Sequence, residues 1–162
     1  KKNDIKIIED CSQAHGASIN NKQVGSFGDV ATWSFCTDKI ISTLGEGGMI
    51  STNNKKIYNY CQTHINHGSV LLKKNNSEKF IYNKHFFGTN LRITEIQSIA
   101  GIEQLKKLKK IQKKREKMSL DYLNIFLKYP KYISCYFPPK HIKSAWYRFY
   151  FFIKKIQRIS NK

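Results

Sequence analysis

The sequence of 162 residues predicts an α/β domain that gives way to the start of a smaller α+β domain. In the first half, short apolar runs are separated by glycine-rich breaks, a pattern typical of buried strands joined by crossovers. In the second half, a long helical segment is followed by a tail that alternates aromatic and polar residues, which is typical of strands. This order places the domain boundary near residue 118, so that residues 1–117 belong to the larger domain and residues 118–162 begin the smaller one.

Three strands are expected in the first third of the chain. Apolar runs predict them at Ile5–Ile8 (followed by Glu9 and Asp10), at Val30–Phe35 and at Gly48–Thr52. Between the first two runs, residues 12–17 are expected to form a turn or a short helical segment. Residues 20–29 are punctuated by glycine and are expected to form a loop.

Two helices are expected further along the chain. Residues 53–63 form the first, with a cap at Thr52 or Asn53 and an end near Gly68. The second runs from about Thr94, its cap, to Tyr129, with an interruption or bend near Met118 and Ser119 and an end at Pro130. Residues 69–88 are polar, rich in lysine and aperiodic, which predicts a long loop, whereas residues 132–137 and 145–153 are expected to be strands.

The formal net charge of +18 raises the hypothesis of a nucleic-acid-binding protein. Lysine carries nearly all of this charge, although arginine is the better fork for bases and phosphates. In and just before the densest run, residues 106–117, apolar residues recur every three positions at Leu105, Leu108 and Ile111, which predicts an amphipathic helix with a solvated basic face. Nucleic-acid binding is therefore kept only as the least favoured alternative.

The remaining composition favours a cytoplasmic globular protein without a metal site. The cysteines, at positions 11, 36, 61 and 135, form no CxxC pair and have no zinc-site spacing with histidine, so they are interpreted as reduced thiols. No run approaches the roughly 18 apolar residues of a membrane span. The N-terminal segment lacks the apolar core and cleavage site of a signal peptide.

Polar side chains follow the expected strands at positions that suggest a binding site. Asp10 ends the first strand and Gln13 lies just after it, while Ser34 ends the second strand and Lys39 follows in the next loop. Ligands of open α/β sheets bind at the carboxyl ends of strands. A carboxylate, an amide, a hydroxyl and an amine there suit pyridoxal 5'-phosphate, whose Schiff base needs an amine and whose pyridinium nitrogen needs a carboxylate. Each residue taken singly is more often a cap, a buried small residue or a surface charge.

Several motifs occur together in an order that resembles one family. They are "IIEDCSQAHGA", "VGSFGDVATWSF", "DKIISTLGEGGMIST", "NHG" and "GTNLRITEIQSIAGIEQLKKL", and a fainter likeness continues through "SAWYRFYFFI". The chain thereby resembles the DegT/DnrJ/EryC1/StrS family of pyridoxal-phosphate-dependent sugar aminotransferases. The resemblance implies a partial large domain of the three-layer, aspartate-aminotransferase-like fold (fold type I) plus the start of the small domain. Family members are more than twice this length, so the chain is expected to be a central fragment.

The resemblance also implies roles for individual residues. Lys39 matches the catalytic lysine that holds the cofactor covalently, Asp10 the partner of its pyridinium nitrogen, and Gln13 the residue near its phenolic oxygen. Ser34 matches a phosphate ligand. Asn90 of the "GxNxR" motif is expected to reach the cofactor phosphate of a partner subunit in a homodimer, with Arg92 nearby. Some members carry histidine in place of the lysine and dehydrate sugars, so Lys39 favours the aminotransferase branch.

Other candidates receive structural interpretations. His15 is weighed evenly between a supporting role near the site and a structural one. His64 and His67 are interpreted as helix-end packing, the glycines at positions 45, 47 and 48 as a tight turn, and residues 146–152 as sheet core. Glu46 is either structural or lines the site.

The function implied by the resemblance is transfer of an amino group, from glutamate as the usual donor, to a keto group of a nucleotide-linked deoxysugar. Such a step would serve amino-sugar or cell-surface polysaccharide synthesis, including lipopolysaccharide. The alternative is a catalytically incomplete fragment that keeps the motifs without turnover.

Overall fold

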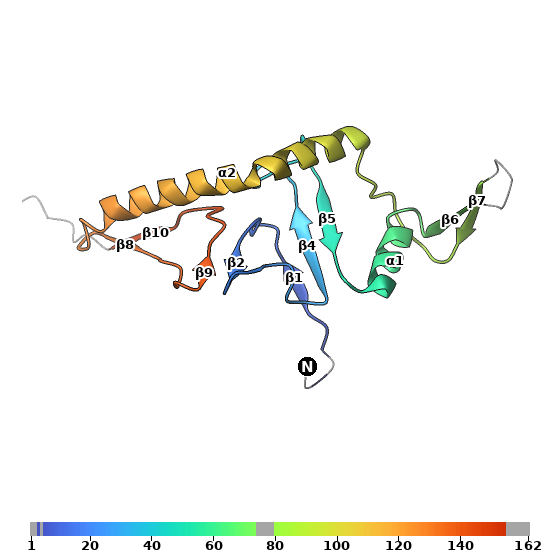
Figure 1. Ribbon diagram of the computed structural model, residues 1–162, viewed down its shortest axis with the longest axis horizontal. Coiled ribbons are helices and arrows are strands. Elements are labelled where there is room, and N and C mark those ends of the chain that lie inside the picture. Colours follow the sequence, from blue (N-terminus) through green and yellow to red (C-terminus); the bar gives the residue numbers. More distant parts are fainter. Residues whose placement is uncertain (1–2, 4, 74–79, 155–162) are drawn as a thin grey trace, which may run out of the picture.

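A computed structural model of the chain describes residue 3 and residues 5–73 and 80–154. The molecule is elongated: the long helix α2 lies along one side, the central strands and the small sheets lie beneath it, and α1 with the β6–β7 hairpin lies beyond one end (Figure 1). Among the described residues, no helix is both long and apolar enough to cross a membrane.

The central sheet has the strand order β1-β4-β5 and carries the expected site residues at one edge. β1 (Ile8–Asp10) runs parallel to β4 (Val30–Ser34), and β4 pairs in antiparallel fashion with β5 (Gly48–Ser51). The second and third expected strands are confirmed. The first begins three residues later than expected, because pairing with β4 starts only at Ile8 opposite Val30. It is not buried either, since Ile5, Ile7 and Ile8 are exposed.

A second small sheet joins the two ends of the chain, with the order β3-β2-β9. β2 (Ser18–Ile19) and β3 (Lys22–Gln23) form a hairpin whose turn and second strand lie in residues 20–29, the region expected to be loop. Its turn residues Asn20 and Asn21 have φ values of 49° and 62°, which is the geometry that asparagine tolerates in tight hairpins. β9 (Ile142–Lys143) pairs with the other edge of β2. The C-terminal segment is thereby fixed beside the loop that follows β1.

Helix α1 (Lys55–His64) confirms the first expected helix, although its cap is Asn54, one residue later than expected. The Asn54 side chain accepts hydrogen bonds from the backbone N–H groups of Lys56 and Ile57, which have no partner within the helix. The expectation of a long loop over residues 69–88 is wrong. β6 (Ser69–Lys73) and β7 (Phe80–Lys84) pair as an antiparallel ladder in which each strand supplies the hydrogen bonds that the other needs.

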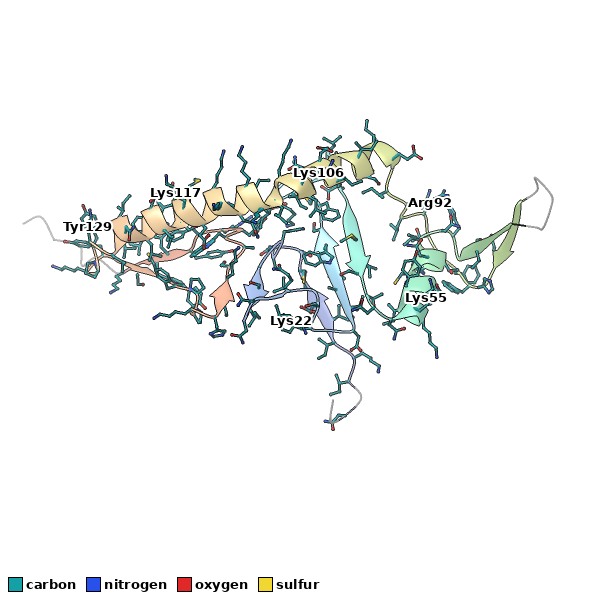
Figure 2. The ribbon with its side chains drawn as sticks, in the orientation of Figure 1. Lys22, Lys55, Arg92, Lys106, Lys117 and Tyr129 are labelled. Carbon is teal, nitrogen blue, oxygen red and sulfur yellow. The ribbon has the colours of Figure 1, made fainter. Side chains whose placement is uncertain are left out.

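Helix α2 (Glu95–Phe126) is continuous, so the expected interruption near Met118 is wrong. Thr94 caps it as expected, in a reciprocal capping box with Gln97. Ser119 stays within the helix because it is buried and small, and it lies on the same face as buried Leu123. On the opposite face, Lys106 and Lys117 project away from the sheets (Figure 2), whereas Leu105 is exposed and does not contribute to the apolar face.

The C-terminal segment contains less strand than expected. β8 (Ile133–Cys135) pairs with β10 (Phe151–Ile153), but residues 145–150 form no strand. Trp146 adopts a left-handed backbone with φ of 49°, which ends any extended run there. The core is small. Its centre consists of four buried residues, Ala17, Ile40, Ile41 and Ala145. The residues that pack against this centre include Phe35, Leu108, Ile111 and Tyr147.

Side chains of α2 anchor three separate loops. Gln97 Nε2 donates to the Glu46 carbonyl at 2.9 Å, and Gln112 Nε2 donates to the His15 carbonyl at 2.6 Å. Arg115 Nη1 donates to the carbonyls of Trp146 and Tyr147 at 3.0 and 3.1 Å. One of these loops carries Tyr147, which contacts Lys39, and another carries His15, whose pKa Lys39 affects, so α2 supports part of the candidate site.

Candidate active site

Lys39 lies in the loop that leaves β4, and its position is fixed by the residues around it. Its backbone N–H donates to the Cys36 carbonyl at 3.0 Å. The next two residues, Ile40 and Ile41, are buried in the core and hold the loop down. The Lys39 side chain is itself only 15% exposed. An amine shielded in this way differs from the solvated lysines of α2.

The immediate neighbours of the Lys39 amine are a carboxylate and an aromatic ring. Lys39 Nζ lies 3.4 Å from Asp38 Oδ1 and 5.2 Å from the centre of the Tyr147 ring. Burial lowers the pKa of Lys39, but the charge of Asp38 and the contact with Tyr147 outweigh it, so that the pKa is raised overall. In this arrangement the amine is held as an ammonium ion.

Asp10 and Ser34 lie at the same edge of the central sheet because β1 and β4 are parallel. Asp10 Oδ1 accepts a hydrogen bond from the Ser12 backbone at 3.0 Å. Hydrogen bonds from Ser12, reinforced by the positive charge of Lys39, lower the pKa of Asp10, so the carboxylate is ionised at neutral pH. Ser34 Oγ is half-buried and accepts weakly from the Cys36 backbone N–H at 3.4 Å. Its hydroxyl hydrogen remains available to an anion.

Gln13 lies in the loop after β1 and faces a cavity of about 270 Å³. The loop contributes Gln13, Ala14 and Ala17, and the C-terminal segment contributes the facing wall, which includes Tyr147 and Arg148. The structure therefore brings Asp10, Ser34 and Lys39 to one end of the sheet, with Gln13 on the adjoining loop. Residues 146–152 were expected to be sheet core, but several of them line this cavity instead.

His15 is buried against the underside of the site. Its ring is 3% exposed and lies 5.5 Å from the Trp33 ring and 5.8 Å from the Phe35 ring, centre to centre. Neither ring nitrogen has a partner at hydrogen-bond geometry among the described residues, although the Ser34 backbone lies near the ring. Burial lowers the pKa of His15, and the charge of Lys39 lowers it further, while the nearby Ser34 backbone opposes both. The imidazole is neutral at pH 7 and offers an unsatisfied donor and acceptor.

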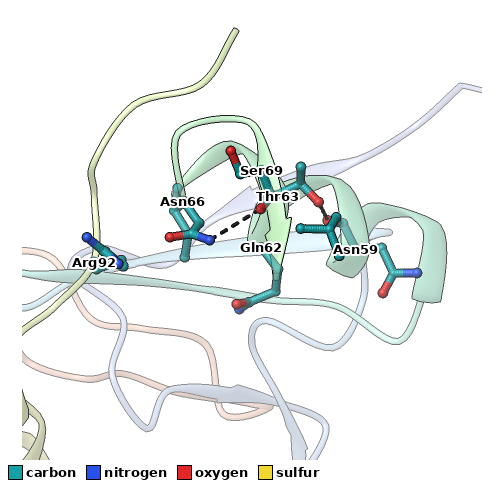
Figure 3. Close-up of a pocket in the computed structure, with 8 residues that line it drawn as sticks. Asn59, Gln62, Thr63, Asn66, Ser69 and Arg92 are labelled. Atoms are coloured by element: carbon teal, nitrogen blue, oxygen red, sulfur yellow. Dashed lines mark hydrogen bonds between the residues drawn. The ribbon is translucent and has the colours of Figure 1, made fainter. Parts of the chain in front are cut away.

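Asn90 and Arg92 lie apart from this cluster, in the segment between β7 and α2. Arg92 Nε donates to Asn90 Oδ1 at 3.1 Å, and Asn90 forms an isolated β-bridge with Asn66. Arg92 lines a cavity of about 450 Å³ beside α1, together with Asn59, Gln62, Thr63, Asn66, Ser69 and two apolar residues, Ile65 and Val70 (Figure 3). No hydrogen bond or ion pair among the described residues links Asn90 or Arg92 to Lys39. Within one chain the two groups are separate.

Two residues at the site were missed by sequence reasoning. Asp38 contacts Lys39 directly, and Tyr147 contacts both. Tyr147 lies 109 positions from Asp38 in the sequence, so no local pattern indicates the contact. Asp38 is adjacent to the lysine, and that adjacency was the one available signal.

Elsewhere, His64 stacks with Tyr60 and Phe86 at the end of α1. Among the described residues, no group of three or more metal-ligating side chains occurs.

Comparison with known proteins shows which family this chain resembles. The profile of the DegT/DnrJ/EryC1/StrS aminotransferase family matches residues 1–162. GDP-perosamine synthase of Escherichia coli O157:H7 is 36% identical over 102 residues, which are 63% of this chain and 26% of that protein. The chain thus spans about a quarter of the length of this curated relative.

Solved structures of related enzymes have the same fold as this chain. An aminotransferase from Psychrobacter cryohalolentis superposes with a TM-score of 0.85 at 32% identity, over 94% of this chain and 41% of that one. E. coli GDP-4-keto-6-deoxy-D-mannose-3-dehydratase with bound hydrated PLP gives a TM-score of 0.82 at 29% identity, over 97% and 42%. The fold is therefore part of the PLP-dependent aminotransferase fold of these neighbours. With the family profile matching its whole length, the chain belongs to the DegT/DnrJ/EryC1/StrS aminotransferase family.

Proposed function

We propose that the protein represented by this chain is a pyridoxal-phosphate-dependent aminotransferase that acts on a nucleotide-linked keto-deoxysugar. The observation that carries the proposal is the shielded amine of Lys39 beside the ends of two parallel strands that present Asp10 and Ser34. A dehydratase shares the fold almost as closely as an aminotransferase does, so the fold does not separate the two reactions. The lysine at position 39 favours amino transfer.

The residues present fit the cofactor. Lys39 supplies the amine that would hold it covalently, and ionised Asp10 would bind its pyridinium nitrogen. Ser34 would donate to its phosphate, and Gln13 would lie near its phenolic oxygen. The unpartnered ring nitrogens of buried His15 show that this region has hydrogen-bonding capacity that the chain alone leaves unused. When bound, the cofactor supplies an electron sink for the carbon that loses a proton.

The chain's own contribution to the reaction is to bind, orient and move protons. Lys39 Nζ, once free of its covalent role, would be the base that carries a proton between the substrate carbon and the cofactor. Asp10 keeps a negative charge in place because its pKa is lowered, which stabilises a neighbouring protonated nitrogen. The loop beyond Lys39 is tied to the core, so the amine returns to the same position after each cycle.

The proposed substrates and assembly are those expected of a member of this family. GDP-perosamine synthase is a relative, which supports a nucleotide sugar as the amino acceptor; glutamate is proposed as the donor. We also propose that the protein is a cytoplasmic homodimer in which Asn90, with Arg92 beside it, serves the cofactor phosphate of the partner subunit. Among the described residues, Asn90 and Arg92 bind each other and neither has a hydrogen bond or ion pair with Lys39 of the same chain, which supports a shared site. The product would enter amino-sugar or lipopolysaccharide synthesis. The domain boundary near residue 118 remains part of the proposal.

The proposal is tested by following amino transfer in the full-length protein that contains this chain. ¹⁵N-labelled glutamate and a GDP-, UDP- or dTDP-linked 4-keto-6-deoxysugar are supplied with pyridoxal phosphate, and labelled amino sugar is detected by mass spectrometry. Lys39→Ala is expected to reduce turnover to below about a thousandth, because covalent and proton-transfer roles are lost together. Lys113→Ala, on the solvated face of α2, is the matched control. Turnover by the full-length protein but none by this chain alone would favour the incomplete-fragment alternative, and no turnover by the full-length protein with the cofactor bound at Lys39 would overturn the proposal.

A further inference from the structure

The segment that brings Tyr147 to Lys39 is held in a defined conformation. The Trp146 backbone N–H donates to Ser144 Oγ at 3.1 Å, and Trp146 has a left-handed backbone with φ of 49°. Arg115 of α2 binds the carbonyls of Trp146 and Tyr147 through one nitrogen, Nη1. An unfavourable backbone conformation is retained where surrounding contacts over-determine it. The placement of the Tyr147 side chain is therefore built into the fold.

Tyr147 and Lys39 bind the two oxygens of one carboxylate. The Tyr147 hydroxyl donates a short hydrogen bond to Asp38 Oδ2, while Asp38 Oδ1 faces Lys39 Nζ at 3.4 Å. The Tyr147 ring also lies beneath the amine, 5.2 Å from Nζ, where its π face attracts a cation. Arg148 contributes less, since its Nη2 is 3.8 Å from Asp38 and its side chain is 62% exposed. The carboxylate is thus fixed by the tyrosine and in turn holds the lysine.

We propose that Asp38 and Tyr147 are positioning residues for Lys39: the Asp38 carboxylate holds the amine, and the Tyr147 hydroxyl holds that carboxylate. The significance of this arrangement for catalysis rests on the proposed function, but the arrangement itself does not. An amine must be neutral to attack a carbonyl group. A carboxylate that favours the ammonium form keeps the lysine in place and unreactive until an incoming group displaces the pair.

Of the charged and titratable groups near Lys39, only Asp38 forms an ion pair with its amine among the described residues. Asp10 and His15 interact with Lys39 only through longer-range charge, and neither has a hydrogen bond or ion pair with it. Cys36 Sγ donates to Glu46 Oε1 at 3.2 Å and also lies close enough to Asp38 to affect the pKa of that carboxylate. The hydrogen bond from Tyr147, followed by the interaction with Cys36, lowers the pKa of Asp38 to about 2. Asp38 is therefore ionised at every pH at which Lys39 titrates.

The test measures the titration of Lys39 itself. The protein is labelled with trace acetic anhydride at a series of pH values without cofactor, and the acetylation of each lysine is quantified by mass spectrometry. Asp38→Asn is expected to move the Lys39 midpoint about 0.2 to 0.7 pH units lower, the range for a partly exposed ion pair. Tyr147→Phe is expected to move it by less in the same direction, because the carboxylate stays but loses its donor.

The controls separate this effect from a general change in the protein. Asp121→Asn removes an exposed carboxylate of α2 and is expected to leave the Lys39 midpoint unchanged. Lys106, paired with Glu103 at 2.6 Å, serves as the internal reference in every variant. An unchanged Lys39 midpoint in Asp38→Asn, or an equal shift of Lys106, would overturn the proposal. Because no cofactor is used, this result is independent of whether pyridoxal phosphate binds.

Discussion

Substitution of Gly68 by alanine tests how the segment carrying Asn90 is fixed against α1. Gly68 has φ of +70°, which costs an L residue about 1–2 kcal/mol. A Cβ at this position would meet the Phe86 carbonyl oxygen far inside any contact that carbon atoms tolerate. Since the obstacle is backbone and not a flexible side chain, the segment that contains Gly68 must move away from the segment that contains Phe86.

The cost of that separation follows from the hydrogen bonds that cross it. His85 N–H donates to the Gly68 carbonyl at 2.8 Å, and His67 N–H donates to the Thr89 carbonyl at 3.1 Å. Losing both costs about 1–3 kcal/mol at 0.5–1.5 kcal/mol each. Together with the backbone strain, Gly68→Ala is expected to lower the free energy of unfolding by about 2–5 kcal/mol.

Urea unfolding followed by circular dichroism measures this loss. With a slope of about 2 kcal/mol/M, the midpoint is expected to fall by about 1–2.5 M. Gly45→Ala is the matched control, because Gly45 also has positive φ, +142°, but a Cβ there meets nothing within 4 Å. It reports the strain alone. Equal midpoint shifts in the two variants would refute the argument from the backbone collision.

Further substitutions and pH test other parts of the fold. Glu9→Gln is expected to cost about 1–3 kcal/mol in urea unfolding, because the Glu9 carboxylate accepts three backbone N–H bonds from the loop of residues 25–28 at 2.6–2.7 Å. Glu103→Gln, on exposed α2, is the control and should leave the urea midpoint unchanged. Leu123→Ala is expected to cost about 2–5 kcal/mol, since Leu123 is 2% exposed, whereas a loss equally large in exposed Leu105→Ala would contradict that assignment of burial. The pKa of His15 is lowered on folding, so its contribution to stability is full above about pH 6.5 and is lost as the pH falls below it. His15→Phe should flatten that part of the stability profile, and an unchanged profile would exclude His15 as its source.

Elements with strong local signals were predictable from the sequence. The apolar run of β4 and the capping threonine of α2 gave the right strand and the right helix start, because both depend on neighbouring residues. The β6–β7 hairpin was missed because its two strands are stabilised by pairing with each other and not by alternation within either. The pairing of β9 with β2 joins opposite ends of the chain, and no local pattern reports it.

In the candidate site too, some residues could be predicted from local sequence and others could not. Family motifs indicate Asp10, Ser34 and Lys39, and the parallel pairing of β1 with β4 brings their strand ends to one edge of the sheet. The Tyr147 contact depends on Arg115 and on the left-handed backbone of Trp146, and neither is visible in the composition or periodicity of an aromatic segment. The roles assigned to these residues, and to Asn90 across an interface, stay predictions.

The central claim is that Lys39 is the amine that binds the cofactor. The most direct measurement is to incubate the protein with pyridoxal phosphate, reduce it with borohydride, digest it and map the pyridoxyl groups by mass spectrometry. Because the sequence contains so many lysines, selectivity is the informative result. We expect modification to be dominant at Lys39, well above the solvated Lys106 and Lys113 of α2. Scattered labelling, with Lys39 no more modified than those two, would contradict the assignment of this chain's active site.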